Sequence, residues 1–255
     1  MPKRFHPPDF GVDNPVLAPA AKDQTEAATA NDGVNSLVVW SDYRAGNYDI
    51  YAARVAADGW LLDPTGIPIS TAVDDQLEPS VVFGGGEYWV VWADHRSGTG
   101  WDLYGARVTP AEVVLDTQAL PVSIAAGAQR RPSVTFNGSQ VLAVWQDGRG
   151  TDSDIYGARI NSSGVVLDAA GFLISGATKD QTAPAAVFDG THNLVVWQDR
   201  HGGTADIYGT LVAPTGTVTN PAGISISTAT ADQTRPSAVY GGPLGGFFTA
   251  WSDAR

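Results

Sequence analysis

The stretch LAVWQDGRGTDSDIYGARI, Leu142–Ile160, decides the fold, because close copies of it recur along the chain. Five tryptophans mark the copies at intervals of 52, 53, 52 and 54 residues: Trp40, Trp92, Trp145, Trp197 and Trp251. Five glutamines keep nearly the same period: Gln24, Gln76, Gln129, Gln181 and Gln233. A period near 50 residues is typical of propellers and solenoids, whose units bury their faces against neighbouring units. We therefore expect one domain of five units.

Four strands are predicted within the second unit, separated by Gly, Asp and Pro turn signals. They cover Pro79–Phe83, Tyr88–Asp94, Trp101–Val108 and Leu120–Ile124. The second is apolar on both faces, as an antiparallel strand is when its sheet is sandwiched between two others. Radially stacked blades meet this condition, so we predict an all-β protein, a five-bladed β-propeller of four-stranded antiparallel blades. A solenoid is the alternative, but it needs polar end caps that the sequence does not show.

The blade boundaries follow from the glutamines. We expect blades at about 25–75, 76–128, 129–180 and 181–232, with the fifth made of 233–255 plus 1–24. Aligning Gln24 with Gln76 lays Pro15–Gln24 on Ile67–Gln76, so the N-terminal segment is predicted to supply the outer strand of blade five. Its third strand has no good counterpart. An open edge there would let a strand from another subunit dock and give a homo-oligomer.

The hairpin sequence also resembles known repeats. The stretch SDYRAGNYDIYAARVAADG, Ser41–Gly59, resembles a blade hairpin of the bacterial protein TolB, and the VVWQDGRG and DIYGARI pattern resembles tandem repeats of large secreted or surface proteins of bacteria. The resemblance covers residues 20 to 255. It implies a propeller that binds other molecules, located outside the cell or at its surface.

Composition narrows the partners. With 15 basic and 27 acidic side chains the formal charge is -12, which disfavours nucleic acid and anionic membranes. The absence of cysteine excludes disulfides and thiol chemistry. No run of 18 apolar residues occurs, so membrane insertion is not expected, and the chain as given carries no export signal. Carbohydrate or a protein surface remains as partner.

The first three hairpins repeat a tryptophan, an arginine and two aspartates, and the other two repeat most of this set. Aspartates in turns accept hydrogen bonds from nearby backbone, and arginine can bridge carboxylates, so we expect a structural role for this motif. Its members are Trp40, Asp42, Arg44, Asp49, Trp92, Asp94, Arg96, Asp102, Trp145, Asp147, Arg149, Asp154, Trp197, Asp199, Asp206, Trp251, Asp253 and Arg255. Repeated sugar sites or calcium are the alternatives. Calcium is disfavoured because arginine stands where a ligand should be, so no cofactor or metal is expected.

Positions that differ between blades indicate a single site. Two residues after each glutamine stand Glu26, Glu78, Arg131, Ala183 and Arg235. We expect two carboxylates to face two guanidiniums at the mouth of the channel, as paired rim charges or as a polar funnel. Glu26 and Glu78 are the only candidates for a catalytic acid and base, and Arg131 and Arg235 are candidates for ligand binding.

Aromatic residues distinguish the hairpins of the first two blades, which carry Tyr43, Tyr48, His95 and Trp101. A flat ring beside charged acceptors is how many sugar sites are built, so these four are candidate ligand contacts. The alternative is that they only cover the blade edge. In blade four His201 replaces the arginine, which we interpret as a tolerated substitution.

Function is the weakest inference from sequence. Five-bladed propellers include glycoside hydrolases of the arabinanase and invertase kinds and lectins of the tachylectin kind. Hydrolases need two differently placed carboxyls, whereas these blades are nearly alike. We therefore expect a non-enzymatic extracellular recognition or structural module that binds carbohydrate. The alternatives are a funnel-type glycoside hydrolase or lyase, and a subunit of an oligomer or filament joined at blade five.

Overall fold

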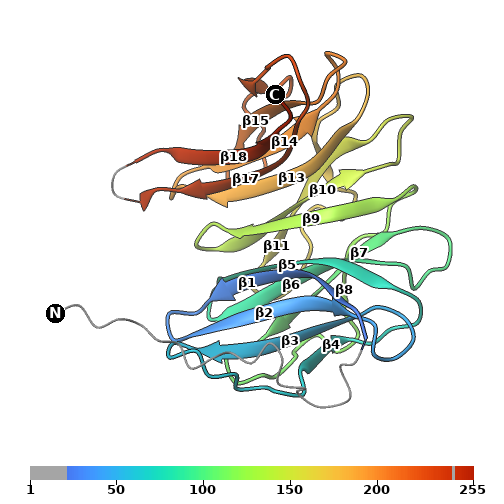
Figure 1. Ribbon diagram of the computed structural model, residues 1–255, viewed down its shortest axis with the longest axis vertical. Coiled ribbons are helices and arrows are strands. Elements are labelled where there is room, and N and C mark those ends of the chain that lie inside the picture. Colours follow the sequence, from blue (N-terminus) through green and yellow to red (C-terminus); the bar gives the residue numbers. More distant parts are fainter. Residues whose placement is uncertain (1–21, 243–244) are drawn as a thin grey trace.

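The computed structural model describes residues 22–242 and 245–255, and this part is built from strands (Figure 1). The strands of the first two sheets are β1 (Gln24–Asn31), β2 (Asn35–Asp42), β3 (Asp49–Ala56), β4 (Ile67–Ser70), β5 (Gln76–Gly84), β6 (Glu87–Asp94), β7 (Asp102–Val108) and β8 (Leu120–Ser123). Those of the other three are β9 (Gln129–Phe136), β10 (Gln140–Asp147), β11 (Asp154–Asn161), β12 (Phe172–Ser175), β13 (Gln181–Phe188), β14 (Asn193–Asp199), β15 (Asp206–Val212), β16 (Ile224–Ser227), β17 (Gln233–Tyr240) and β18 (Phe247–Asp253).

The sheets confirm the predicted all-β fold of four-stranded antiparallel blades. Four are four-stranded, antiparallel and ordered as in the sequence, from β1-β2-β3-β4 to β13-β14-β15-β16. The first strands pack side by side in sequence order, β1 on β5, β5 on β9, β9 on β13 and β13 on β17, so they are the inner strands of a propeller. No helix in the described part is long and apolar enough to cross a membrane.

A bulge near the start of each inner strand is the main departure from the expected strands. In the second blade the strand begins at Gln76, not Pro79, and its register to β6 shifts between Leu77 and Ser80. Glu78 sits in this bulge with a φ of 57°. The same left-handed backbone recurs at the other variable positions, Glu26 (59°), Arg131 (52°), Ala183 (51°) and Arg235 (54°). Non-glycine residues seldom adopt it, so these side chains are aimed by an unusual backbone.

The core lies between blades. Second strands such as β6 are buried along almost their whole length, because each sheet is covered on both faces. Trp92, Trp145 and Trp197 are completely buried, and Trp145 packs with Trp89 and Val91 of the preceding blade. Burial of such large side chains is the main force that holds one blade on the next.

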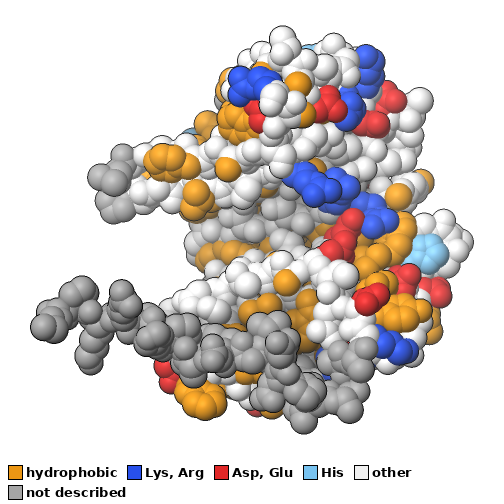
Figure 2. Space-filling model, viewed as in Figure 1, with side chains coloured by type: hydrophobic (Ala, Val, Ile, Leu, Met, Phe, Trp, Pro, Cys, Tyr) orange, Lys and Arg blue, Asp and Glu red, His pale blue; other side chains and the backbone are white. Residues whose placement is uncertain are grey.

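Blade five differs from the others. The described residues give it two strands, β17 and β18. Phe248 is 60% exposed, although its counterparts Trp89 and Leu142 are at most 3% exposed. Trp40, on the first blade, is likewise only half-buried. Figure 2 shows a hollow between the β17–β18 hairpin and the first blade. The expected outer strand at Pro15–Gln24 falls almost entirely outside the described residues.

Candidate functional site

The hairpin aspartates of the first three blades are saturated with hydrogen bonds. In blade two, Asp94 accepts from Trp92 Nε1 at 2.8 Å, from the Arg96 backbone N–H at 2.9 Å and from Arg96 Nη2 at 2.6 Å. The guanidinium also lies 4.0 Å from the centre of the Tyr104 ring. Asp94 is fully buried. Its oxygens are therefore occupied by the blade itself, and the same contacts recur around Asp42 and Asp147.

Blades four and five carry weaker versions of this motif. Asp199 accepts from Trp197 Nε1 at 2.9 Å, and His201 Nδ1 lies 2.6 Å from its other oxygen. His201 thus takes the place of arginine, but one ring nitrogen contacts Asp199 where two guanidinium nitrogens contact Asp94. In blade five Arg255 pairs with Asp253 at 2.7 Å, with the arginine side chain 63% exposed.

The second aspartate of the first four hairpins lies near the first, buried in Asp49 and Asp206 and half-buried in Asp102 and Asp154. Asp49 pairs in register with Asp42, and burial raises the pKa of its carboxyl to about 6, against an opposing hydrogen bond from Asn47. Burial also raises the pKa values of its counterparts Asp102, Asp154 and Asp206. Among the described residues, no three His, Cys, Asp or Glu side chains gather as a metal site.

A second arginine–aspartate pair escaped the sequence analysis. Arg107 on β7 holds Asp116 through Nε at 2.9 Å and Nη2 at 2.9 Å. It also reaches the Ser162 carbonyl of the next blade at 3.3 Å. The equivalent pairs are Arg54 with Asp63 and Arg159 with Asp168. Blade four replaces both partners at once, with Leu211 and Asn220. That joint replacement is the sequence signal that could have revealed the pair.

The repeated glutamines join the links to the hairpins at one face. The Gln76 backbone N–H donates to the Tyr48 carbonyl at 2.6 Å, and its Nε2 donates to the Asp74 carbonyl at 2.6 Å. Gln129 repeats the first contact with the Trp101 carbonyl at 2.7 Å. Inner-strand starts and hairpins therefore meet at the same end of the propeller, where the variable bulge residues lie.

The two bulge glutamates hold the bulge of the following blade. Glu26 Oε2 accepts from the Glu78 backbone N–H at 2.7 Å, and Glu78 Oε2 accepts from the Arg131 backbone N–H at 2.7 Å. Glu78 is also ion-paired with Arg130 at 2.8 Å. We expected Glu26 and Glu78 to face Arg131 and Arg235. The structure instead supplies Arg130, because it precedes the bulge and points back across the blade interface.

The two bulge arginines line a cavity of about 450 Å³. Its other lining residues are Gln146, Thr182, Gln198, Thr234 and Ser252. All of them are polar and none is acidic. The sequence placed Arg131 and Arg235 near the channel mouth, but it could not show that Gln146 and Gln198 join them from the second strands.

The hairpin aromatics stack on each other in pairs. The rings of Tyr43 and Tyr48 lie 4.9 Å apart, and those of His95 and Trp101 lie 5.1 Å apart. Arg130 from the next blade covers Trp101 at 4.2 Å. All four rings are half-buried. Their role as ligand contacts stays a prediction, and the packing gives each ring a partner within the protein.

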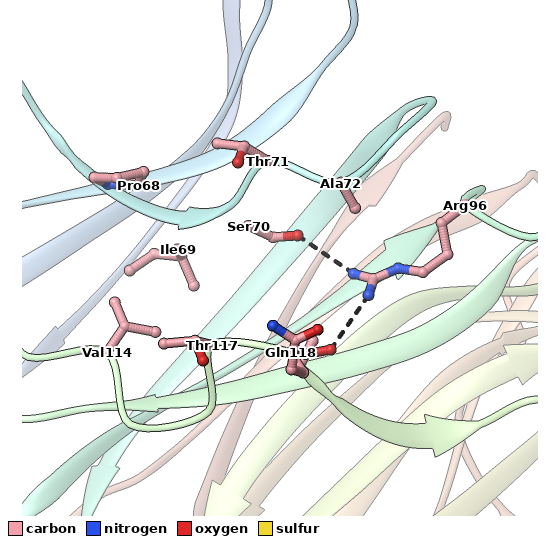
Figure 3. A pocket seen from close by; sticks show the side chains of 10 residues that line it. Pro68, Ile69, Ser70, Thr71, Ala72, Arg96, Val114, Thr117 and Gln118 are labelled. Carbon is pink, nitrogen blue, oxygen red and sulfur yellow. Dashed lines mark hydrogen bonds between the residues drawn. The ribbon is translucent and has the colours of Figure 1, made fainter.

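Two smaller cavities flank the blades. One of about 270 Å³ is lined by Gln24, Thr25, Glu26, Ala27, Val38 and Trp40, on the first blade. The other, of about 330 Å³, lies between β4 of the first blade and the turn before β8 of the second (Figure 3). Arg96 enters it and donates to Ser70 Oγ at 3.3 Å and to the Gln118 carbonyl at 3.4 Å. Because Arg96 is neutralised by Asp94, this second cavity offers no free charge.

Solved structures share this architecture. They include a thermostable family-43 glycoside hydrolase, with TM-score 0.58, 11% identity, and 89% of this chain and 83% of that chain covered. An endo-arabinase from Bacteroides thetaiotaomicron VPI-5482 gives 0.56 and 12%, with 92% and 91% covered. An alpha-L-arabinofuranosidase from Lactobacillus brevis gives 0.55 and 12%, with 93% and 84% covered. No protein-family model and no curated protein matches the chain.

These similarities establish the five-bladed propeller fold and correct one expectation. We expected a non-enzymatic recognition or structural module, because the blades are so alike. That expectation was wrong, since the solved propellers that this chain resembles are glycoside hydrolases. Likeness among the blades is explained by their shared hydrogen-bonded motifs, which fix the hairpins and leave the bulge positions free to differ.

Proposed function

We propose that the protein is a carbohydrate-active enzyme, a glycoside hydrolase that takes a glycan into the mouth of its funnel. The observation that carries the proposal is the pair of carboxylates at the funnel mouth: Glu26 Oε2 accepts from the Glu78 backbone N–H at 2.7 Å, so glutamates of two neighbouring blades lie side by side there. The alpha-L-arabinofuranosidase and the endo-arabinase of the same fold support this choice of class.

Glycoside hydrolysis needs two carboxyl groups with different tasks. Glu78 is ion-paired with Arg130, as suits a base or nucleophile that acts in its charged form. Glu26 has no cationic partner among the described residues, and its Oε1 makes no hydrogen bond there, so we assign it the role of proton donor to the leaving oxygen. The location outside the cell or at its surface, which the resemblance to bacterial surface repeats implies, belongs to the same proposal.

Product analysis tests this function. The chain is incubated with linear arabinan, arabinoxylan and polygalacturonate, and released sugars are separated by chromatography. We expect release from at least one glycan, and a fall in kcat of at least ~100-fold in Glu26→Gln and Glu78→Gln, as for loss of a general acid or base. Glu112→Gln is the matched control, because Glu112 is exposed on the turn after β7. Release that is equal in all three variants, or no release by a folded protein, would overturn the proposal.

A further inference from the structure

The two halves of the funnel mouth use the same backbone position differently. On the first two blades the bulge residue is a glutamate whose carboxylate holds the next blade's backbone. On blades three and five it is Arg131 or Arg235, and neither side chain has an ion-pair or hydrogen-bond partner among the described residues. The arginines are therefore not explained as blade contacts.

The surroundings of these arginines favour an anion. Both line one cavity of about 450 Å³, which lies in the size range of small-ligand sites. Gln146, Gln198 and Thr182 supply amides and hydroxyls to the same space, and no lining residue is acidic. A cavity lined by two arginines and no acidic residue is unusual on a chain of net charge -12. Figure 2 shows basic side chains gathered beside acidic ones across the middle of this face.

We propose that this cavity binds an anionic group on a sugar, so that the glycan taken by the funnel is an acidic one. Arginine forks bind carboxylates and sulfates through paired N–H donors, while glutamine and threonine pair with sugar hydroxyls. Two arginines from different blades, β9 and β17, converge on one cavity and so fix the anion between them. The inference rests on the proposed function, because it names the substrate class of the same funnel.

The bulge backbone does not account for the two arginines. Arg131 and Arg235 adopt φ values of 52° and 54°, as the bulge residue does in every blade. Ala183 shows that a small, uncharged residue also fits this bulge. Folding alone thus does not require arginine at the two positions.

Titration calorimetry with matched sugars tests the site. The probes are a galacturonic acid tetramer, its methyl ester, which keeps the sugar and removes the charge, and a chondroitin sulfate tetramer. We expect at least one charged tetramer to bind at least 10-fold more tightly than the ester. Because chondroitin sulfate carries uronate carboxylates as well as sulfates, sulfate is identified only if this tetramer binds tightly and the galacturonic acid tetramer does not. Equal affinity for the ester and both charged tetramers would overturn the proposal.

Variants locate the binding. Arg131→Gln and Arg235→Gln keep the Cβ and the backbone requirement, and each should lower affinity for the acidic tetramer at least 10-fold. Arg200→Gln is the control, since it removes the same charge from a hairpin pair with Asp232 outside the cavity. Effects no larger than the control would overturn the site. Because binding is read without turnover, acid-selective binding with no released product would contradict only the hydrolase function, whereas cleavage of neutral arabinan without acid binding would contradict only this inference.

Discussion

Blades one to three and blade four share a backbone but differ in how their charges are paired. Each of the first three has a bidentate Asp–Arg pair in its hairpin and a second pair from the third strand to the following turn. Blade four has His201 in the first and Leu211 with Asn220 in the second. Its strands β13 to β16 nevertheless pair in the same order and register pattern. Strand pairing and the buried tryptophan therefore form the blade, while the ion pairs reinforce it.

The largest effect is expected from removing the first aspartate. Asp94→Ala leaves Trp92 Nε1 and the Arg96 guanidinium without their buried acceptor, which should lower the free energy of unfolding by about 3–5 kcal/mol. Asp199→Ala in blade four removes fewer hydrogen bonds and should cost about 2 kcal/mol. Urea unfolding measures both. Equal losses would show that the arginine contributes nothing in blade two.

The second pair can be tested by copying blade four into blade two. Arg107→Leu alone leaves the partly buried Asp116 unpaired and should cost about 2 kcal/mol. Adding Asp116→Asn removes the stranded charge, so the double variant should recover to within about 1 kcal/mol of the parent. A double-mutant cycle in urea measures the coupling. Additive losses would contradict the hypothesis that the two residues are coupled and were therefore replaced together at Leu211 and Asn220.

Asp49 predicts a pH dependence. Its folded pKa of about 6 lies above the unfolded value near 3.9, so the folded state holds a proton that the unfolded state has released between about pH 4 and 6. The protonated Asp49 therefore contributes its full share to the free energy of unfolding below pH 4, and this share is lost as the pH rises through 6. Asp49→Asn should abolish this loss, and gain about 1–2 kcal/mol on the parent between pH 4 and pH 7. Thermal unfolding of parent and variant across this pH range measures the difference. If stability depends on pH in the same way in both proteins, the raised pKa of Asp49 is contradicted.

The smallest effect should come from making blade four resemble the others. His201→Arg places a guanidinium beside Asp199 and over Tyr208, whose ring already contacts His201 at 4.9 Å. A partly exposed bidentate pair of this kind should add about 0.5–1 kcal/mol. Thermal unfolding at pH 7 compares it with the parent. A destabilised variant would show that blade four has adapted its hairpin to histidine.

Sequence periodicity predicted most of the fold because period and alternation are local properties of the chain. The 52-residue spacing and the doubly apolar stretch Tyr88–Asp94 were enough for blades, strand order and the buried tryptophans. The bulge was not predictable, since Glu26, Glu78, Arg131, Ala183 and Arg235 share no residue type that favours a positive φ. The Arg130–Glu78 pair was missed for a related reason: its partners lie 52 residues apart and meet only when blades stack.

By itself, the sequence determined an all-β propeller of five similar units with tryptophans buried between sheets. Its repeats must stack because a single sheet with two apolar faces cannot bury both of them alone. Only the tertiary structure decided which charges are occupied and which are free. The hairpin carboxylates are held by side chains of their own hairpin, and the bulge glutamates hold the backbone of the next blade, which only blade stacking brings into reach. Arg131 and Arg235 instead line a shared polar cavity. Composition cannot distinguish charged side chains that are paired within the protein from those that are not, because pairing depends on which groups pack beside them.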